Sequence, residues 1–424
     1  MKEMELTSLL AEVESREEEL LDLVKDLVSF PTTSPPARNA KEAQDYVTNY
    51  LHQLEFEIDR WNLYDNDPIV VGKKRGADPS SKRLIINGHL DVAAIEEGQV
   101  WKFDPFTCVV TDERLYGRGV ADMKAGMAGA LFALRLLHEH GIEPEGDVMI
   151  QSVVGEEVGE AGTKSCCDKG YDADLAIVVD TSNCEIQGQG GVITGWITVE
   201  SPTTFHDATR RSMIHAGGGL YGASAIEKMM LLLQGLQSLE RHWGVTKQSD
   251  GFPPGSTTIN PAVIRGGQHA AFIADRCELW ITVHYYPEEH YEDVVKEIEE
   301  HLHHVAMADP WLQNHPPTFT WGGTSMIEDE GEIFPSFSID QDHYGVQLLA
   351  QAHEQMFQEP VNYSMSPTVT DGGWLAEAGI PTVLYGPGTL EQAHAVNESL
   401  DRDQFLKFTK TMVSFLYKWY QQKN

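Results

Sequence analysis

Histidines and carboxylates stand at the ends of several short apolar runs in this chain of 424 residues. Such runs are typical of strands that are buried on both faces of a parallel sheet. The carboxyl ends of these strands form the ligand crevice of an open α/β sheet. Imidazole nitrogen and carboxylate oxygen together suit Zn²⁺ or a similar divalent ion. The candidate residues are His89, Asp91, Asp122, Glu156, Glu157, Asp180 and His394.

Each candidate also has an ordinary structural explanation when it is taken alone. A His-x-Asp pair is more often a structural pair, a Glu-Glu pair is usually solvated, and an Asp after a strand is commonly a helix cap. The glycine-rich turn at 117–124 is similar to a phosphate loop, but it lacks the Gly-Lys-Ser/Thr ending and does not directly follow a strand. The joint occurrence of these residues, rather than any one of them, favours a metal site.

The elements that must position these residues alternate between strands and helices. Apolar runs predict buried strands, and apolar residues at helical spacing predict helices on either side of them. The predicted strands are 84–86, 148–154, 175–179 and 381–385, and the predicted helices are 20–28, 125–139 and 402–420. The middle of the chain differs, since 195–199 and 278–284 alternate polar and apolar residues as one-sided antiparallel strands do, beside amphipathic helices at 223–239 and 291–305.

This pattern predicts an α/β fold with a mostly parallel sheet and an inserted α+β domain. We expect residues 1–190 and 328–424 to form the catalytic domain, and residues 191–327 to form the insert. The boundary follows the change from continuous apolar runs to alternating ones.

Charge and cysteine content exclude several classes of function. The net charge of −34 argues against nucleic acid and against anionic membranes as partners, because both attract cationic proteins. No run reaches the roughly 18 apolar residues of a membrane span, and the acidic start of the chain is unlike a targeting segment. Five cysteines without a CxxC pair indicate neither a disulfide framework nor a zinc knuckle, so we expect a reducing, cytoplasmic location.

The motifs, taken in order, resemble those of the M20 metallopeptidases, which include acetylornithine deacetylase and succinyl-diaminopimelate desuccinylase. The resemblance covers essentially the whole chain. The matching segments are 88–92 (Gly-His-Leu-Asp-Val), 117–124 (Gly-Arg-Gly-Val-Ala-Asp-Met-Lys), 155–157 (Gly-Glu-Glu), Asp180, 386–394 and the Asn-Glu pair at 397–398. It implies a di-zinc catalytic domain and a ferredoxin-like lid that also makes a homodimer.

The resemblance also implies a role for each candidate. His89 and Asp180 would hold one metal ion, Glu157 and His394 the other, and Asp122 would bridge both. The ions would be Zn²⁺, with Co²⁺ or Mn²⁺ as alternatives. Asp91 would hydrogen-bond the second nitrogen of His89, as metal-bound histidines usually require, and Glu156 would be the general base. In the lid, His206 would stabilise the oxyanion, and Asn260 would lie near the substrate.

Departures from the family pattern bear on the substrate. Asp180 stands where the deacylases usually carry Glu, which weakly favours a dipeptidase. His284 stands where an arginine usually grips the substrate's carboxylate, and Gly373 replaces the arginine of a second motif. Other arginines that could substitute are Arg210, Arg211 and Arg265.

The favoured function is therefore the hydrolysis of a linear amide that lacks an α-carboxylate. The enzyme would remove a small acyl group, acetyl or formyl, from a small amine, as the acetylornithine deacetylase branch does. That branch includes a formylaminopyrimidine deformylase of thiamine salvage, whose substrate carries no carboxylate. A dipeptidase is the alternative. A non-catalytic metal-binding relative is disfavoured because Glu156 and all five expected ligands are present.

Overall fold

The computed structural model describes residues 2–209 and 222–422, and these divide into two compact units. One unit comprises Met1–Gln189 and Phe337–Asn424, and the other comprises Gly190–Ser336. The second boundary, expected at 328, falls after β17 (Ile333–Phe334) because this strand pairs with β11 (Gly191–Glu200) of the middle unit.

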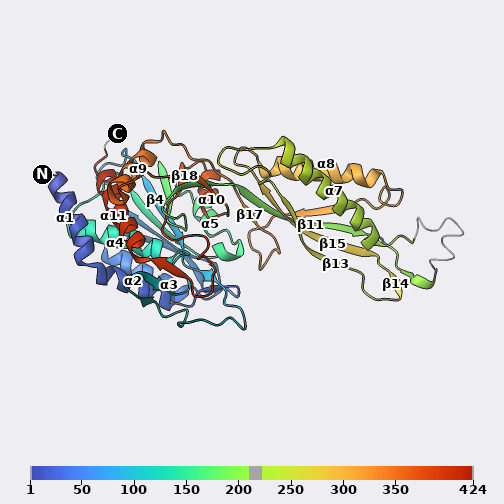
Figure 1. Cartoon of the computed structure of the whole chain (residues 1–424), viewed down its shortest axis with the longest axis horizontal. Helices are drawn as coiled ribbons and strands as arrows, with labels where there is room; N and C mark the ends of the chain where they lie inside the picture. The colour runs from blue at the N-terminus through green and yellow to red at the C-terminus, as the bar shows by residue number, and fades with distance from the viewer. Residues whose placement is uncertain (1, 210–221, 423–424) are drawn as a thin grey trace. The chain divides into compact units, whose positions relative to one another are not determined.

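An eight-stranded sheet forms the centre of the first unit (Figure 1). Its strand order is β18-β10-β19-β9-β4-β8-β3-β2. The strands are β2 (Glu57–Tyr64), β3 (Asp67–Lys74), β4 (Leu84–His89), β8 (Val148–Val153), β9 (Leu175–Val178), β10 (Ile186–Gln189), β18 (Tyr363–Ser366) and β19 (Thr382–Leu384). The central strands β19, β9, β4 and β8 are parallel, whereas β3 and β10 join them antiparallel on the two flanks. The mostly parallel sheet predicted from the apolar runs is confirmed.

Helices cover both faces of this sheet, which explains why the central strands β4, β8, β9 and β19 are buried along their whole length. Leu84 and Ile86 pack into the larger core with the helices of one face, while Ile85 packs into a smaller core on the other. The larger core is built with α1 (Lys2–Ser15), α2 (Glu17–Ser29), α3 (Lys41–Gln53), α4 (Lys124–Glu139), α9 (Tyr344–Phe357) and α11 (Arg402–Trp419). Helices α5 (Gly162–Asp168) and α10 (Gly372–Glu377) lie against each other, and α10 packs on β9 and β19.

Short strands complete the first unit around the edge of the sheet. They are β1 (Thr33–Ser34), which pairs with β5 (Val92–Ala93), and the ladder of β20 (Ser399–Asp401), β7 (Arg114–Tyr116) and β6 (Val109–Val110). The pairing of β20 with β7 brings the segment after His394 beside the segment before Asp122.

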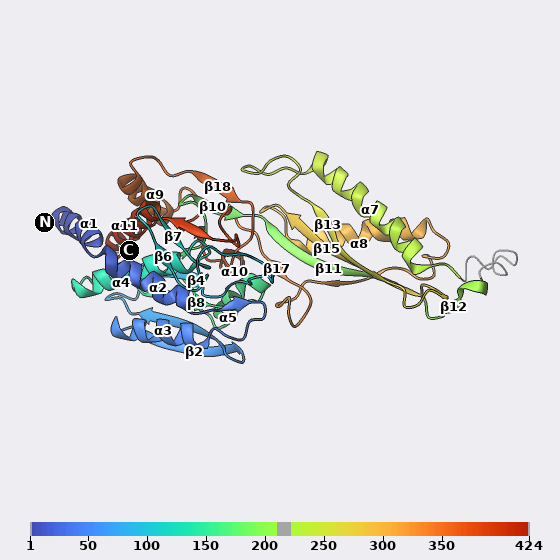
Figure 2. The same cartoon turned by 60° about the horizontal axis from the view of Figure 1, so that its bottom comes forward.

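The middle unit is an antiparallel sheet with two helices packed on it (Figure 2). Its main strands lie in the order β13 (Ile259–Gly266), β15 (Arg276–Tyr285), β11 and β16 (Thr318–Trp321), and its helices are α7 (Ala225–Thr246) and α8 (Tyr291–Met307). The chain order of strand, helix, two strands, helix and strand is that of a ferredoxin-like fold. A short pair, β12 (Phe205–His206) with β14 (Phe272–Ile273), extends it.

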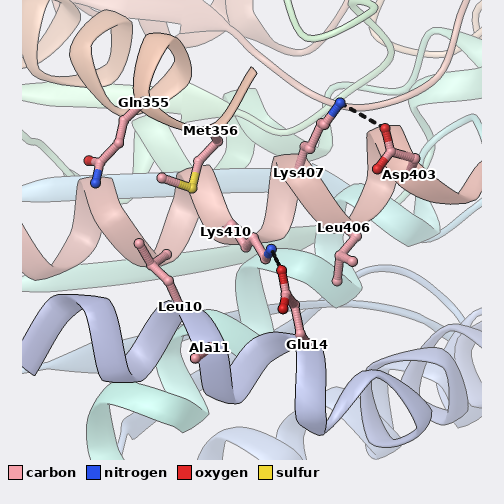
Figure 3. A pocket seen from close by; sticks show the side chains of 9 residues that line it. All are labelled: Leu10, Ala11, Glu14, Gln355, Met356, Asp403, Leu406, Lys407 and Lys410. Atoms are coloured by element: carbon pink, nitrogen blue, oxygen red, sulfur yellow. Dashed lines mark hydrogen bonds and ion pairs between the residues drawn. The ribbon is translucent and has the colours of Figure 1, made fainter. Parts of the chain in front are cut away.

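A groove of about 470 Å³ lies on the outside of the first unit, between α1, α9 and α11 (Figure 3). Two lysines line it, and each is ion-paired: Lys407 Nζ lies 2.8 Å from Asp403, and Lys410 contacts Glu14. Both of these cations are therefore neutralised within the protein. No helix in the described ranges is long and apolar enough to cross a membrane.

Candidate active site

Three neighbouring parallel strands each deliver a candidate residue to their carboxyl ends. His89 is the last residue of β4, Glu156 opens the 3₁₀ helix Glu156–Val158 after β8, and Asp180 follows β9. Because β8, β4 and β9 are adjacent in the sheet, their ends meet. His89 Nε2 lies 3.7 Å from Asp180 Oδ2 and 3.8 Å from Glu156 Oε2.

Asp122 stands between the two histidines of the cluster. It lies in the turn before α4, and its Oδ1 is 3.3 Å from His89 Nε2 while its Oδ2 is 3.3 Å from His394 Nε2. His394 comes from the loop between β19 and β20, and its Nε2 is also 2.7 Å from Glu157 Oε2. One carboxylate thus faces two imidazoles with separate oxygens, which is the arrangement of a bridging ligand.

Asp91 supports this cluster mainly through its backbone carbonyl. His89 Nδ1 lies 3.0 Å from the Asp91 carbonyl oxygen and 3.5 Å from the carboxylate Oδ1. The other carboxylate oxygen, Oδ2, accepts the backbone N–H of Glu157 at 3.1 Å. The resemblance led us to expect a hydrogen bond between Asp91 and the second nitrogen of His89. Here the Asp91 carbonyl is the nearer partner of Nδ1, and the carboxylate holds the backbone N–H of Glu157.

The crowding of buried carboxylates shifts their protonation strongly. Burial raises the pKa of Glu156 well above its usual range and that of Glu157 to about 7, with the neighbouring acids adding to both effects. Burial opposes a charged His89, yet the carboxylates that surround it, above all Asp122, outweigh burial and raise the His89 pKa well above normal. Hydrogen bonds to Asp122 and Glu157 raise the pKa of His394 to about 11. The cluster therefore has an excess of negative charge that bound cations would compensate.

The donor atoms fit a divalent-metal centre. Among the described residues, His89 Nε2 and Glu157 Oε1 are buried atoms without a hydrogen-bond partner. Atoms of His89, Asp122 and Glu157 lie within 4.8 Å of one another, close enough to share one ion. Buried polar atoms normally have a hydrogen-bond partner, and metal ligation explains why His89 Nε2 and Glu157 Oε1 lack one.

A buried ion pair joins the two loops that carry Asp122 and His394. Glu398 Oε2 accepts Arg118 Nη1 at 2.8 Å and the Gly119 N–H at 3.1 Å. Its Oε1 accepts the backbone N–H groups of Ala121 at 2.8 Å and Asp122 at 3.1 Å. The guanidinium of Arg118 also donates to the His394 carbonyl at 3.2 Å. Both residues lie within the motif segments of the sequence, but their partnership became apparent only in the fold.

A further buried carboxylate, Asp371, stands beside the predicted substrate residue Gly373. Asp371 precedes α10 and is 2% exposed, and burial raises its pKa to about 7. Gly373 is the second residue of α10 and is buried. The role of Gly373 toward substrate remains a prediction.

The remaining predicted residues belong to the middle unit. His206 is exposed on β12, Asn260 is exposed on the outer strand β13, and His284 is exposed near the end of β15, where its Nδ1 lies 3.1 Å from Thr258 Oγ1. Arg265 stacks on Trp196 with its guanidinium carbon 4.6 Å from the ring centre. Arg210 and Arg211, the other two candidate anchors, lie outside the described residues. The roles of His206, Asn260 and His284 remain predictions.

Comparison with known proteins identifies relatives over the full length of the chain. Residues 85–418 match the model of peptidase family M20/M25/M40. The chain is 62% identical over 415 residues to N-formyl-4-amino-5-aminomethyl-2-methylpyrimidine deformylase of Halalkalibacterium halodurans, covering 98% of this chain and 97% of that one. It is 53% identical over 422 residues to the deformylase of the same name from Bacillus subtilis, covering 99% of both. The solved structure of the dipeptidase Dug1p from Saccharomyces cerevisiae has the same fold, with a TM-score of 0.71, 16% identity and 99% coverage of each chain. The chain therefore belongs to peptidase family M20/M25/M40.

Proposed function

We propose that this chain is a metal-dependent amidohydrolase that removes the formyl group from N-formyl-4-amino-5-aminomethyl-2-methylpyrimidine. Water and the formamide would give formate and the free aminomethyl group. The observation that carries this proposal is the 62% identity, over 98% of the chain, to a deformylase of that substrate. The cluster of imidazoles and carboxylates at the sheet edge supplies a centre suited to amide hydrolysis.

Five side chains would hold two divalent ions, which we expect to be Zn²⁺, with Co²⁺ or Mn²⁺ as alternatives. These side chains are His89 and Asp180 for one ion, Glu157 and His394 for the other, and Asp122 between them. When bound, such a pair of ions polarises the amide carbonyl and lowers the pKa of a water molecule. Asp91 holds His89 through Nδ1 and fixes the nitrogen that faces the metal.

Glu156 is the group placed to move the proton. Its carboxylate would take a proton from the attacking water as the water oxygen bonds to the formyl carbon. As the carbon–nitrogen bond breaks, Glu156 would give that proton to the leaving nitrogen. The burial that raises the pKa of Glu156 favours this role, because a raised pKa lets a carboxylate hold a proton between the two steps.

Residues of the middle unit are candidates for contact with the substrate. The formylated pyrimidine has no carboxylate, and the chain carries His284 and Gly373 where the family resemblance led us to expect arginines that bind one. We propose that His206 stabilises the developing oxyanion and that Asn260 contacts the substrate. A His206→Ala variant that keeps the wild-type kcat would remove the first assignment.

Identification of the products tests the proposed function. The zinc-loaded protein is incubated with the formylated pyrimidine, and formate and amine are measured by nuclear magnetic resonance. We expect the two products in equal amounts. A panel of free-amine dipeptides tests the dipeptidase alternative suggested by Asp180, and we expect no hydrolysis there.

We also propose that the protein is a homodimer joined through the middle unit. β13 is an outer strand, and Val263 and Ile264 on it are 43% and 55% exposed. Ile226 of α7 is also exposed, and a Cβ atom on Gly266 of β13 would lie 2.8 Å from it, so strand and helix form one apolar surface. An unpaired strand edge with apolar side chains suits pairing with a second copy. Light scattering should give a dimer mass, and Ile264→Lys should give a monomer, whereas an unchanged dimer in the variant would place the interface elsewhere.

Free thiols support a reducing compartment. All five cysteines are unpaired, and four of them are buried. We propose a cytoplasmic location, and fractionation of cells that express the chain would contradict it by recovering the protein outside the cytoplasm.

A further inference from the structure

A bidentate ion pair between Arg38 and Glu160 lies at the base of the loop that carries Glu156. Arg38 Nη1 donates to Glu160 Oε2 at 2.9 Å, and Nη2 donates to Glu160 Oε1 at 2.8 Å. The side chain of Glu160 is completely buried, while that of Arg38 is 23% exposed. The pair joins segments that are 122 residues apart in the sequence. Two parallel charge-assisted hydrogen bonds fix orientation as well as distance.

The guanidinium of Arg38 is itself held rigidly. Its carbon lies 3.8 Å from the centre of the Tyr64 ring, and Nη1 is 3.2 Å from Asp67 Oδ2. The same Asp67 oxygen accepts the backbone N–H of Arg38 at 2.7 Å. Tyr64 and Asp67 belong to the β2–β3 hairpin of the sheet. The contacts of Arg38 with the hairpin therefore fix where its guanidinium lies, and the guanidinium in turn fixes the position of the Glu160 carboxylate.

Glu160 in turn closes the loop that contains the proposed general base Glu156 and the proposed metal ligand Glu157. Its backbone N–H donates to the Gly155 carbonyl at 2.7 Å. Gly155 has a φ of 91°, and a Cβ atom there would lie 2.5 Å from the Glu160 Cβ. The turn is therefore tight, and a shift of Glu160 would alter the backbone that carries Glu156.

The carboxylate of Glu156 depends on this backbone for its position. No group among the described residues hydrogen-bonds to it, and it makes an ion-pair contact of 3.8 Å with His89 Nε2. By contrast, Glu157 is anchored by Asp91 through its N–H and lies 2.7 Å from His394 through its carboxylate. Glu156 is therefore held by the loop rather than by its own side-chain contacts.

We propose that Arg38 and Glu160 are positioning residues that set the distance between the Glu156 carboxylate and the attacking water. The inference rests on the proposed function for the identity of the reaction. Disruption of the pair would leave the metal ligands in place and misplace the base. Misplacement of a catalytic group by about 1 Å can cost about a hundredfold in rate.

The test compares Glu160→Gln with Glu19→Gln. Glu19 makes a bidentate pair of similar geometry with Arg16, at 2.8 and 2.9 Å, but its side chain is 49% exposed. This pair lies beside the C-terminal end of α4, whereas Asp122 precedes the N-terminal end of that helix. Metal content, kcat and KM are measured for both variants, together with hydrogen exchange of the peptide that spans 154–163. Arg38→Lys is measured in parallel, because a lysine keeps the charge but cannot bond both oxygens of Glu160 in the same way.

We expect Glu160→Gln and Arg38→Lys to retain two metal ions and to lower kcat about ten- to a hundredfold, with KM changed by less than about twofold. Exchange in 154–163 should rise in both, and Glu19→Gln should match the wild type in every readout. Wild-type kcat and wild-type exchange in either folded variant would overturn the proposal. If the wild type does not cleave the formylated pyrimidine, the proposed function fails, whereas the exchange comparison still decides whether the ion pair holds the loop.

Discussion

Replacement of Glu398 by glutamine tests how the metal loops are held together. The carboxylate is completely buried and accepts four hydrogen bonds, two on each oxygen. An amide of the same shape keeps one oxygen and presents an NH₂ group to two donors. If the NH₂ group takes the place of Oε2, it faces the Arg118 guanidinium and the Gly119 N–H. If it takes the place of Oε1, it faces the backbone N–H groups of Ala121 and Asp122. Two buried donors then lose their acceptor whichever way the amide is turned.

The size of the effect follows from these lost bonds. Each buried donor without a partner costs about 1–3 kcal/mol, so the variant should lose about 2–6 kcal/mol of folding free energy. The melting temperature should fall by roughly 10 °C, at about 2–4 °C for each kcal/mol in a domain of this size. Because Asp122 and His394 are both positioned by the pair, metal affinity should fall by about 10- to 100-fold.

Two measurements decide the matter. Calorimetry gives the melting temperature, and titration with a metal chelator followed by elemental analysis gives the metal affinity. Glu359→Gln, on an exposed residue, serves as the matched control and should change neither. Wild-type stability together with wild-type metal affinity in Glu398→Gln would refute the view that this carboxylate fastens the two loops.

Three further outcomes are expected. Glu156→Gln should lower kcat about 10²- to 10⁴-fold while two metal ions stay bound, and near wild-type turnover would remove the general-base assignment. Removal of the metal by a chelator should abolish turnover, and addition of Zn²⁺ should restore it; turnover that persists at zero metal content would contradict the site. Burial alone would raise the pKa of Asp309. Hydrogen bonds from the Lys228 side chain and from the backbone N–H groups of Trp311 and Leu312 outweigh burial, and the net pKa is lowered. A lowered folded-state pKa adds stability above the unfolded pKa and loses it as the pH falls through the folded value. The melting temperatures of Asp309→Asn and the wild type should therefore differ at pH 7 and converge in acid below about pH 4, and a constant difference would contradict this reasoning.

The sequence predicted the sheet, and the ends of its strands, because both follow from local patterns, whereas the metal-ligand roles came from the family resemblance and remain predictions. The apolar runs that end at His89, at Glu156 and at Asp180 mark strands buried on two faces, and parallel strands bring their carboxyl ends together. The β2–β3 hairpin was not predicted, because its turn at Asp65 and Asn66 lacks the glycine of the usual two-residue hairpin signals, although Asn66 adopts a positive φ of 64°.

Long-range partners could not be predicted in this way. Arg38 follows a proline-rich stretch and Glu160 lies in a glycine-rich loop, and no local spacing relates two residues 122 positions apart. Only the packing of the β2–β3 hairpin against β8 brings them together. The same holds for Arg118 and Glu398, which are 280 positions apart.

The comparison of two substrates tests the central claim most directly. The zinc-loaded protein is assayed for kcat/KM with N-formyl-4-amino-5-aminomethyl-2-methylpyrimidine and with N-acetylornithine. We expect efficient release of formate from the pyrimidine and little or no release of acetate, because His284 and Gly373 stand where we expected arginines that bind an α-carboxylate. Efficient turnover of N-acetylornithine with none of the pyrimidine would contradict the account.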